Sequence, residues 1–147
     1  GGFDPEDEEL YPSLVKNQIS IALDEAEVII FVLDGKEGLM PHDSDVVELL
    51  RRAGKPVIFA VNKIDHSKHE QAAIEFHSLG IEDYIEISAL QGRRINDLLD
   101  MIVELLPGSE ETGDDDEDDG TIKIAVLGKP NVGKSTLFNA LTRSRDA

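Results

Sequence analysis

The chain has 147 residues, of which 40% are hydrophobic and 5% aromatic, as expected for one ordinary globular domain. Its formal net charge is −17, with 31 acidic against 14 basic side chains, which argues against broad non-specific binding to nucleic-acid phosphates. Cysteine is absent, so disulfide frameworks and thiolate metal sites are excluded. No apolar run approaches the ~20 residues that cross a bilayer, and the N-terminus lacks the features of a secretory signal. We therefore expect a soluble, cytoplasmic protein that binds no membrane.

The N-terminal half of the chain alternates helical and strand patterns. Apolar residues at helical spacing predict a helix over residues 13–24, and a continuous β-branched run predicts a buried strand over residues 28–33. The same order of patterns returns as a helix over residues 43–52 and a strand over residues 57–61. A third helix is predicted over residues 69–79. Short strands that are apolar throughout are typical of a parallel sheet covered by helices on both faces.

The C-terminal half continues this alternation across an acidic segment. A strand over residues 84–87 precedes a helix over residues 95–106. Residues 108–120 are rich in like charges that repel and bury no apolar area, so we expect an acidic flexible linker. A basic-partner or metal-binding tail is the alternative, although the ligand spacing of an EF-hand is missing. A strand over residues 122–127 and a helix over residues 134–141 complete an α/β pattern with a doubly wound sheet.

The last strand runs directly into a phosphate-binding motif. Residues 128–135 match G-x-x-x-x-G-K-[ST], with the strand before and the helix after that this P-loop motif requires. Lys134 is expected to reach the β- and γ-phosphates as the catalytic residue of the loop, and the Ser135 hydroxyl is expected to ligate Mg²⁺. An ordinary Gly-rich turn is the alternative. The residues predicted to bind the phosphates are Asn131, Val132, Gly133, Lys134, Ser135 and Thr136.

A second motif, Asn62-Lys63-Ile64-Asp65, follows the strand over residues 57–61. The two carboxylate oxygens of Asp65 match the neighbouring N1–H and 2-amino donors of guanine. Adenine lacks both donors and would leave the carboxylate unpaired, which disfavours an ATPase. The stem of Lys63 can lie along the base, while Asn62 is expected to brace the loops. Because this motif is short, a polar strand-end turn is the alternative when it stands alone.

Ser88, Ala89 and Leu90, after the third strand, form the weakest part of the predicted site. The N–H of Ala89 is expected to contact the 6-oxo group of guanine, although a Ser-Ala pair carries no information by itself. Ser88 lacks the G-x-S-x-G surroundings of a hydrolase nucleophile. His66 and His69 have the spacing of a metal pair but no clear third ligand, so a solvated loop is the better interpretation.

With these motifs, the chain resembles the bacterial Der (EngA) GTPases, which carry two GTPase domains in tandem and serve assembly of the large ribosomal subunit. Residues 22–39 and 61–65 look like parts of the first domain of that family. An acidic linker then leads into residues 122–141, which look like the opening of the second domain. Parts of the pattern also occur in the related Era and MnmE GTPases. The resemblance implies GTP or GDP with Mg²⁺ as ligands, and the large ribosomal subunit as a partner.

The resemblance also assigns residues near the N-terminus. Gly1-Gly2-Phe3 looks like the end of the family's switch II motif D-T-G-G, so Gly2 would donate its N–H to the γ-phosphate as a catalytic residue. Phe3 would stand where other GTPases place a catalytic Gln, and Asn131 matches the P-loop Asn that holds K⁺ in K⁺-dependent members. The switch II Asp would precede residue 1, and the switch I Thr is not reached by residue 147. We therefore expect nucleotide binding with little turnover by these residues alone.

Two arrangements are open. Following the resemblance, residues 1–107 are the base-binding part of one GTPase domain, residues 108–120 are a linker, and residues 121–147 begin another domain. Alternatively, the linker returns residues 122–127 beside residues 28–33, because closure of a flexible loop costs little extra as it lengthens. The result is an incomplete, circularly permuted P-loop NTPase domain with one composite pocket, which we favour. Its predicted strand order is residues 122–127, 28–33, 57–61 and 84–87.

Guanine-nucleotide binding with GTP hydrolysis as the parent activity is the leading function. The alternative is a non-catalytic α/β interaction module with an acidic tether, which would bind no nucleotide. A monomer and a domain-swapped dimer are both compatible with the sequence.

Overall fold

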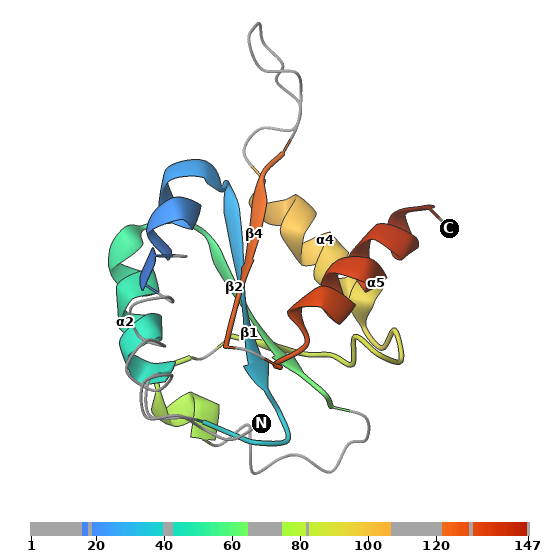
Figure 1. Ribbon diagram of the computed structural model, residues 1–147, viewed down its shortest axis with the longest axis horizontal. Coiled ribbons are helices and arrows are strands. Elements are labelled where there is room, and N and C mark those ends of the chain that lie inside the picture. The colour runs from blue at the N-terminus through green and yellow to red at the C-terminus, as the bar shows by residue number, and fades with distance from the viewer. Residues whose placement is uncertain are drawn as a thin grey trace, which may run out of the picture.

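The computed structural model describes residues 16–17, 19–39, 43–64, 75–81, 83–106, 122–129 and 131–146, with the backbone alone described for residues 144–146 (Figure 1). Several predicted features lie outside these residues. They are the acidic linker over residues 108–120, the N-terminal Gly2 and Phe3, the base-reading Asp65, and His66 with His69.

A four-stranded parallel sheet forms the centre of the structure. Its strands are β1 (Val28–Asp34), β2 (Val57–Asn62), β3 (Ile85–Glu86) and β4 (Ile124–Leu127), in the order β3-β2-β1-β4. Each neighbouring pair is parallel. The strand that precedes the phosphate-binding motif therefore lies beside β1, although almost 100 residues separate Val28 from its partner Ile124. This is the strand order that the sequence predicted for a permuted domain.

Helices cover both faces of the sheet, as predicted for an α/β fold (Figure 1). On one face, α2 (Asp43–Ala53) and helical segments at residues 19–25 and 75–78 pack against alternate side chains of β1. On the opposite face, α4 (Ile95–Leu105) and α5 (Lys134–Asp146) pack against the other side chains of the strand. The side chains of β1 are buried throughout, because neighbouring strands and helices surround them.

Two hydrophobic clusters hold these layers together. The first joins Phe31 and Leu33 of β1 to Leu50 of α2 and to Phe76. The second joins strand residues of the opposite face to the helices α4 and α5; its members include Val28, Ile30, Val32, Ile95, Leu98, Ile102 and Leu137. Leu137 is fully buried, so the helix after the phosphate-binding motif is part of the same core as the rest of the chain.

The structure corrects the prediction for two strands. The strand predicted over residues 84–87 is reduced to Ile85–Glu86, although Ile87 is fully buried beside it. The strand predicted over residues 122–127 begins at Ile124 and is not buried on both faces, since Ile122 is 48% and Ile124 is 39% exposed. Within the described residues β4 pairs with β1 alone, so its start lies at an edge of the sheet.

The helices also differ in extent from the predicted ones. The helix predicted over residues 134–141 continues to Asp146, and α2 and α4 each differ by one residue at the C-terminal end. Of the helix predicted over residues 69–79, the structure describes a turn at residues 75–78. Across the described ranges, no helix is both long and apolar enough to cross a membrane.

Candidate nucleotide-binding site

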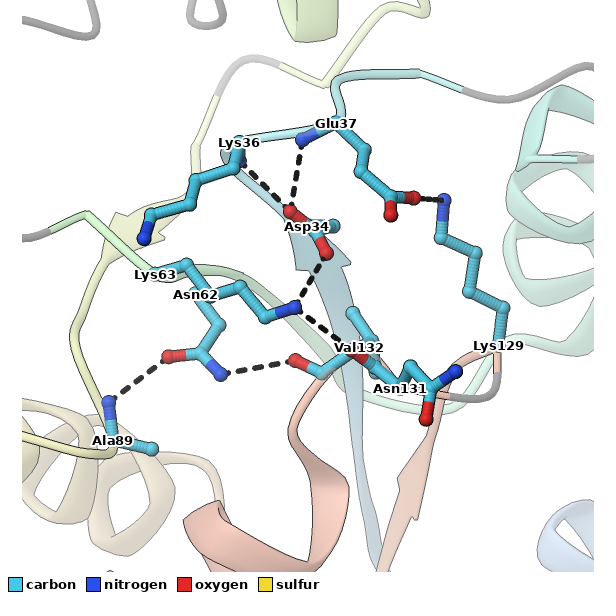
Figure 2. Close-up of polar contacts among 9 residues, drawn as sticks. All are labelled: Asp34, Lys36, Glu37, Asn62, Lys63, Ala89, Lys129, Asn131 and Val132. Atoms are coloured by element: carbon cyan, nitrogen blue, oxygen red, sulfur yellow. Dashed lines mark hydrogen bonds and ion pairs between the residues drawn. The ribbon is translucent and has the colours of Figure 1, made fainter. Parts of the chain in front are cut away.

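Three loops converge where β1, β2 and β4 end. They are the turn after Asp34, the loop that begins at Asn62, and the phosphate-binding loop after Gly128 (Figure 2). The strands are parallel, so their carboxyl ends lie at one edge of the sheet. Ligands of open α/β sheets bind at this edge. The two motifs recognised in the sequence therefore meet at one place in a single chain.

Asn62 joins the phosphate-binding loop to the loop after β3. Its side-chain Nδ2 donates to the carbonyl of Val132 at 3.0 Å, and its Oδ1 accepts from the N–H of Ala89 at 2.9 Å (Figure 2). Asn62 itself is 3% exposed, so both bonds are shielded from water. Each side of the carboxamide is satisfied by a different loop, as expected of a residue that braces the site.

Lys63 makes the second connection to the phosphate-binding loop. Its ammonium donates to the carbonyl of Asn131 at 2.8 Å and to Oδ2 of Asp34 at 2.9 Å (Figure 2). Both Lys63 and Asn131 adopt left-handed backbone conformations, with φ of 71° and 65°. Such a conformation costs about 1 kcal/mol or more for a non-glycine residue and is concentrated at functional sites. The hydrogen bond from Lys63 to Asn131 therefore links two residues with strained backbones.

Asp34 is a buried carboxylate at the end of β1, with a side chain that is 1% exposed. Its Oδ1 accepts from the N–H groups of Lys36 at 2.8 Å and Glu37 at 2.9 Å. Burial by itself would raise the pKa of Asp34. The hydrogen bonds from Lys63, Glu37 and Lys36 outweigh that effect and hold the pKa below its ordinary value. The carboxylate is therefore charged and fully engaged by its surroundings.

Gly133 provides the closest approach between the two motifs. Its φ of 104° is one that side chains rarely adopt, and a Cβ at this position would collide with Nδ2 of Asn62. The absence of a side chain at residue 133 therefore lets the phosphate-binding loop pass against Asn62. Space for a side chain is also lacking at Gly128, since a Cβ there would lie 2.9 Å from the carbonyl oxygen of Val32.

Lys134 begins α5 and folds back over the loop. Its ammonium donates to the carbonyl of Gly128 at 2.6 Å, and burial lowers the pKa of this amine. Ser135 and Thr136 follow in the first turn of α5, where both are exposed. Lys134 and Ser135 line one end of an open groove of about 780 Å³ that extends along β4.

The first turn of α5 has the donors that a phosphate group needs. Free N–H groups at a helix N-terminus and the positive end of the helix dipole favour an anion. Lys134 adds an ammonium group, and burial makes its charged form less favourable. A bound anion would offset this cost by pairing with the charge. The accessible Ser135 hydroxyl is a ligand of the kind that Mg²⁺ accepts beside phosphate oxygens. These residues therefore fit a nucleoside phosphate with its metal ion.

The loop after β3 supports the base-reading motif from the other side. The N–H of Ile64 donates to the carbonyl of Ile87 at 3.0 Å, and Arg93 donates to the carbonyl of Ile64 at 3.1 Å. Ser88 and Ala89 are buried, whereas Leu90 is 85% exposed. In this structure the Ala89 N–H already donates to Asn62, so contact with a guanine 6-oxo group would require this donor to be shared.

A further ion pair connects the turn after β1 to the phosphate-binding loop. Nζ of Lys129 lies 3.3 Å from Oε1 of Glu37 (Figure 2). The Lys129 side chain is 13% exposed and its Nζ has no hydrogen-bond partner among the described residues, although the carboxylate of Glu37 balances its charge. The distance is within ion-pair range, but the geometry is not that of a hydrogen bond.

The structure brings most of the predicted site residues together. Asn62, Lys63, Ser88 and Ala89 lie with the phosphate-binding residues 131–136 around one edge of the sheet. Asp65 and Gly2 lie outside the described residues, and the ligand-binding roles of all the site residues stay predictions. Sequence reasoning missed three charged residues of the site: Asp34, Glu37 and Lys129. An acidic residue directly after a buried strand was the signal for Asp34, whereas nothing in the sequence pairs Glu37 with Lys129.

Two family models match successive parts of the chain. The model of the elongation factor Tu GTP binding domain matches residues 15–108, and that of the 50S ribosome-binding GTPase matches residues 123–147. Over 141 residues, the chain is 49% identical to the GTPase Der of Clostridium botulinum (strain Loch Maree / Type A3) and 48% identical to that of Geotalea daltonii. These alignments cover 96% of this chain and 31% of each relative, so the chain spans about a third of their length.

Solved structures of Era are similar in fold. One is Era in complex with MgGDPNP and nucleotides 1506–1542 of 16S ribosomal RNA, at 29% identity and a TM-score of 0.53, covering 65% of this chain and 34% of that chain. Another is an Aquifex aeolicus Era variant bound to GDP.AlF4⁻, at 29% identity and a TM-score of 0.55, covering 70% of this chain and 35% of that chain. The predicted resemblance to Der is confirmed, and the chain belongs to the GTPase family described by the elongation factor Tu GTP binding domain.

Proposed function

We propose that this chain binds GDP or GTP, with Mg²⁺, in one composite site made from both ends of its sequence. The hydrogen bond from Asn62 to Val132 carries this proposal, because it joins the base-reading motif to the phosphate-binding loop. If the two motifs belonged to separate sites in different domains, this contact between them would not be expected. The bond from Lys63 to Asn131 supports the same arrangement.

Each predicted residue has a defined role in this proposal. The loop at residues 131–133 and the first turn of α5 would surround the phosphates, and Lys134 would neutralise their charge. Ser135 would hold Mg²⁺, which supplies further positive charge to the phosphates when bound. Asp65 would select guanine because its two carboxylate oxygens would accept hydrogen bonds from the N1–H and 2-amino groups of the base. Ala89 would share its N–H with the base, beside Ser88 and Leu90.

We also propose that the longer proteins to which this chain is similar hydrolyse GTP and act in assembly of the large ribosomal subunit. Gly2 would contact the γ-phosphate there. Residues 1–147 include no counterpart of the switch I Thr or of the switch II Asp, so we expect slow turnover by this chain alone. Asn131 would help hold K⁺, and faster hydrolysis in KCl than in NaCl would support that role. Equal rates in both salts would remove K⁺ from the proposal.

Titration with a fluorescent GDP analogue in the presence of Mg²⁺ tests the composite site. Lys134→Ala should abolish phosphate affinity, and Asp65→Ala should abolish the preference for guanine over adenine nucleotides. Lys16→Ala and Asp83→Ala are matched controls, because both side chains are exposed and neither lines the groove beside Lys134. If neither site variant alters binding, the residue assignments are wrong. If the unmodified chain binds no nucleotide, the interaction-module alternative is favoured.

A further inference from the structure

The end of β1 and the turn that follows it have two acidic side chains that face the phosphate-binding loop, and the proposed nucleotide contacts use neither of them. We define the acidic turn as residues 34–37, and we propose that Asp34 and Glu37 position the phosphate-binding loop for its ligand. This inference rests on the proposed function, because it assigns the acidic turn a part in nucleotide affinity. Asp34 and Glu37 are positioning residues, since they act on the loop through lysines.

Asp34 acts through Lys63. One carboxylate oxygen accepts from two N–H groups of its own turn, so its position is fixed by the backbone. The other oxygen accepts from the Lys63 ammonium, which also donates to the carbonyl of Asn131. We infer that the charged hydrogen bond to Asp34 fixes the position of the Lys63 ammonium, so that the ammonium can also donate to the carbonyl of Asn131.

Glu37 acts on the other end of the same loop. Its carboxylate lies 3.3 Å from the ammonium of Lys129, which is buried apart from 13% of its side chain. Lys129 and Asn131 lie two residues apart, so the acidic turn reaches the loop at two neighbouring points (Figure 2). Two points of attachment restrict the motion of the loop more than a single point would. The loop then loses less conformational entropy when the ligand binds.

Charge alone would give the acidic turn the opposite effect. Two carboxylates beside a phosphate site repel the ligand, so neutralising either should strengthen binding if electrostatics alone mattered. Positioning predicts that neutralising either weakens binding. The direction of the change therefore separates the two explanations, without any assumption about its size.

The test measures the affinity of the full chain for a fluorescent GDP analogue with Mg²⁺. Glu37→Gln should weaken binding by about 2- to 5-fold, as for the loss of a partly exposed ion pair. Asp34→Asn should weaken binding by about 10- to 100-fold, as for the loss of a charged hydrogen-bond partner. Glu48→Gln is the matched control, because it removes an exposed ion pair with Arg52 on α2 and should leave binding unchanged. Unchanged or tighter binding by Glu37→Gln would overturn the proposal.

Two features of the variants keep the test decisive if one variant fails to fold. The Glu37→Gln variant keeps a side chain that is 59% exposed, so it should fold even if Asp34→Asn does not. Lys129→Gln alone, and combined with Glu37→Gln, completes a double-mutant cycle in which the second change should add little. Additive losses would show that the two residues act separately, against the proposal.

A readout without nucleotide separates this inference from the proposed function. In the free chain, heteronuclear NOE values of the amides of residues 131–133 should fall in the Asp34→Asn or Glu37→Gln variant, because the loop becomes more mobile on the ps–ns timescale. If the unmodified chain binds no GDP but these values fall, the proposed function fails while the loop contact stands. If they do not change, the acidic turn does not position the loop, whatever the chain binds.

Discussion

The side chain of Asn62 donates a hydrogen bond to the carbonyl of Val132, 70 residues later in the chain, at 3.0 Å. Asn62 ends β2, whereas Val132 precedes α5, so this bond connects two motifs that the acidic linker separates in sequence. Val132 is fully buried in the same hydrophobic cluster as Leu137 of α5. The apolar packing of the Val132 side chain and the hydrogen bond from the Asn62 carboxamide to its carbonyl therefore both hold the phosphate-binding loop in position.

Asn62→Ala tests this connection directly. The substitution leaves the carbonyl of Val132 and the N–H of Ala89 without their buried partner, which should cost about 1–3 kcal/mol of unfolding free energy. Urea unfolding measures that cost, and GDP titration should show weaker binding. Asn139→Ala is the matched control, because Asn139 is exposed on α5. A variant as stable as the unmodified chain would show that the bond does not hold the loop.

Gly133→Ala should abolish nucleotide binding by displacing the phosphate-binding loop. The φ of 104° disfavours alanine, and its Cβ would collide with Nδ2 of Asn62. Gly54→Ala is the control, because Gly54 also has a positive φ, of 77°, but has open space around its position. Both variants should lose stability, by about 1 kcal/mol for Gly54→Ala. Only Gly133→Ala should lose affinity for GDP, and equal losses of affinity would contradict this explanation.

The sequence predicted the alternation of elements and the strand order, because short apolar runs and the two motifs leave few other arrangements. It did not predict the exposed start of β4, since an apolar run does not reveal how many neighbours its strand will have. The connections of the site were predicted in part. The bracing role of Asn62 follows from its motif, whereas the ion pair between Glu37 and Lys129 depends on the packing of loops that no periodic pattern describes.

Stability should depend on Asp34 in acid. The pKa of Asp34 is lowered from 3.8 by its hydrogen bonds, which outweigh the effect of burial, so the carboxylate stabilises the folded state when charged. This contribution is fully present above the unfolded pKa, about 4, and is lost as the pH falls through the lower folded value. Urea unfolding from pH 7 down to about 3 should show a smaller loss in the Asp34→Asn variant than in the unmodified chain. Equal losses would mean that the hydrogen bonds do not favour the charged carboxylate.

The last prediction concerns whether one chain or two supply the site. If Asn62 and Val132 of the same molecule are bonded, the chain should be a monomer that binds one GDP, with a mass that light scattering after gel filtration can measure. A domain-swapped dimer would make the same contacts between two copies. Mixing the Lys134→Ala and Asp65→Ala variants distinguishes the two. In a swapped dimer the mixture should regain sites in which both residues are intact, whereas in a monomer no site can contain both Lys134 and Asp65. Recovery of guanine-selective GDP binding on mixing, after brief unfolding to exchange chains, would therefore rule out the intramolecular site.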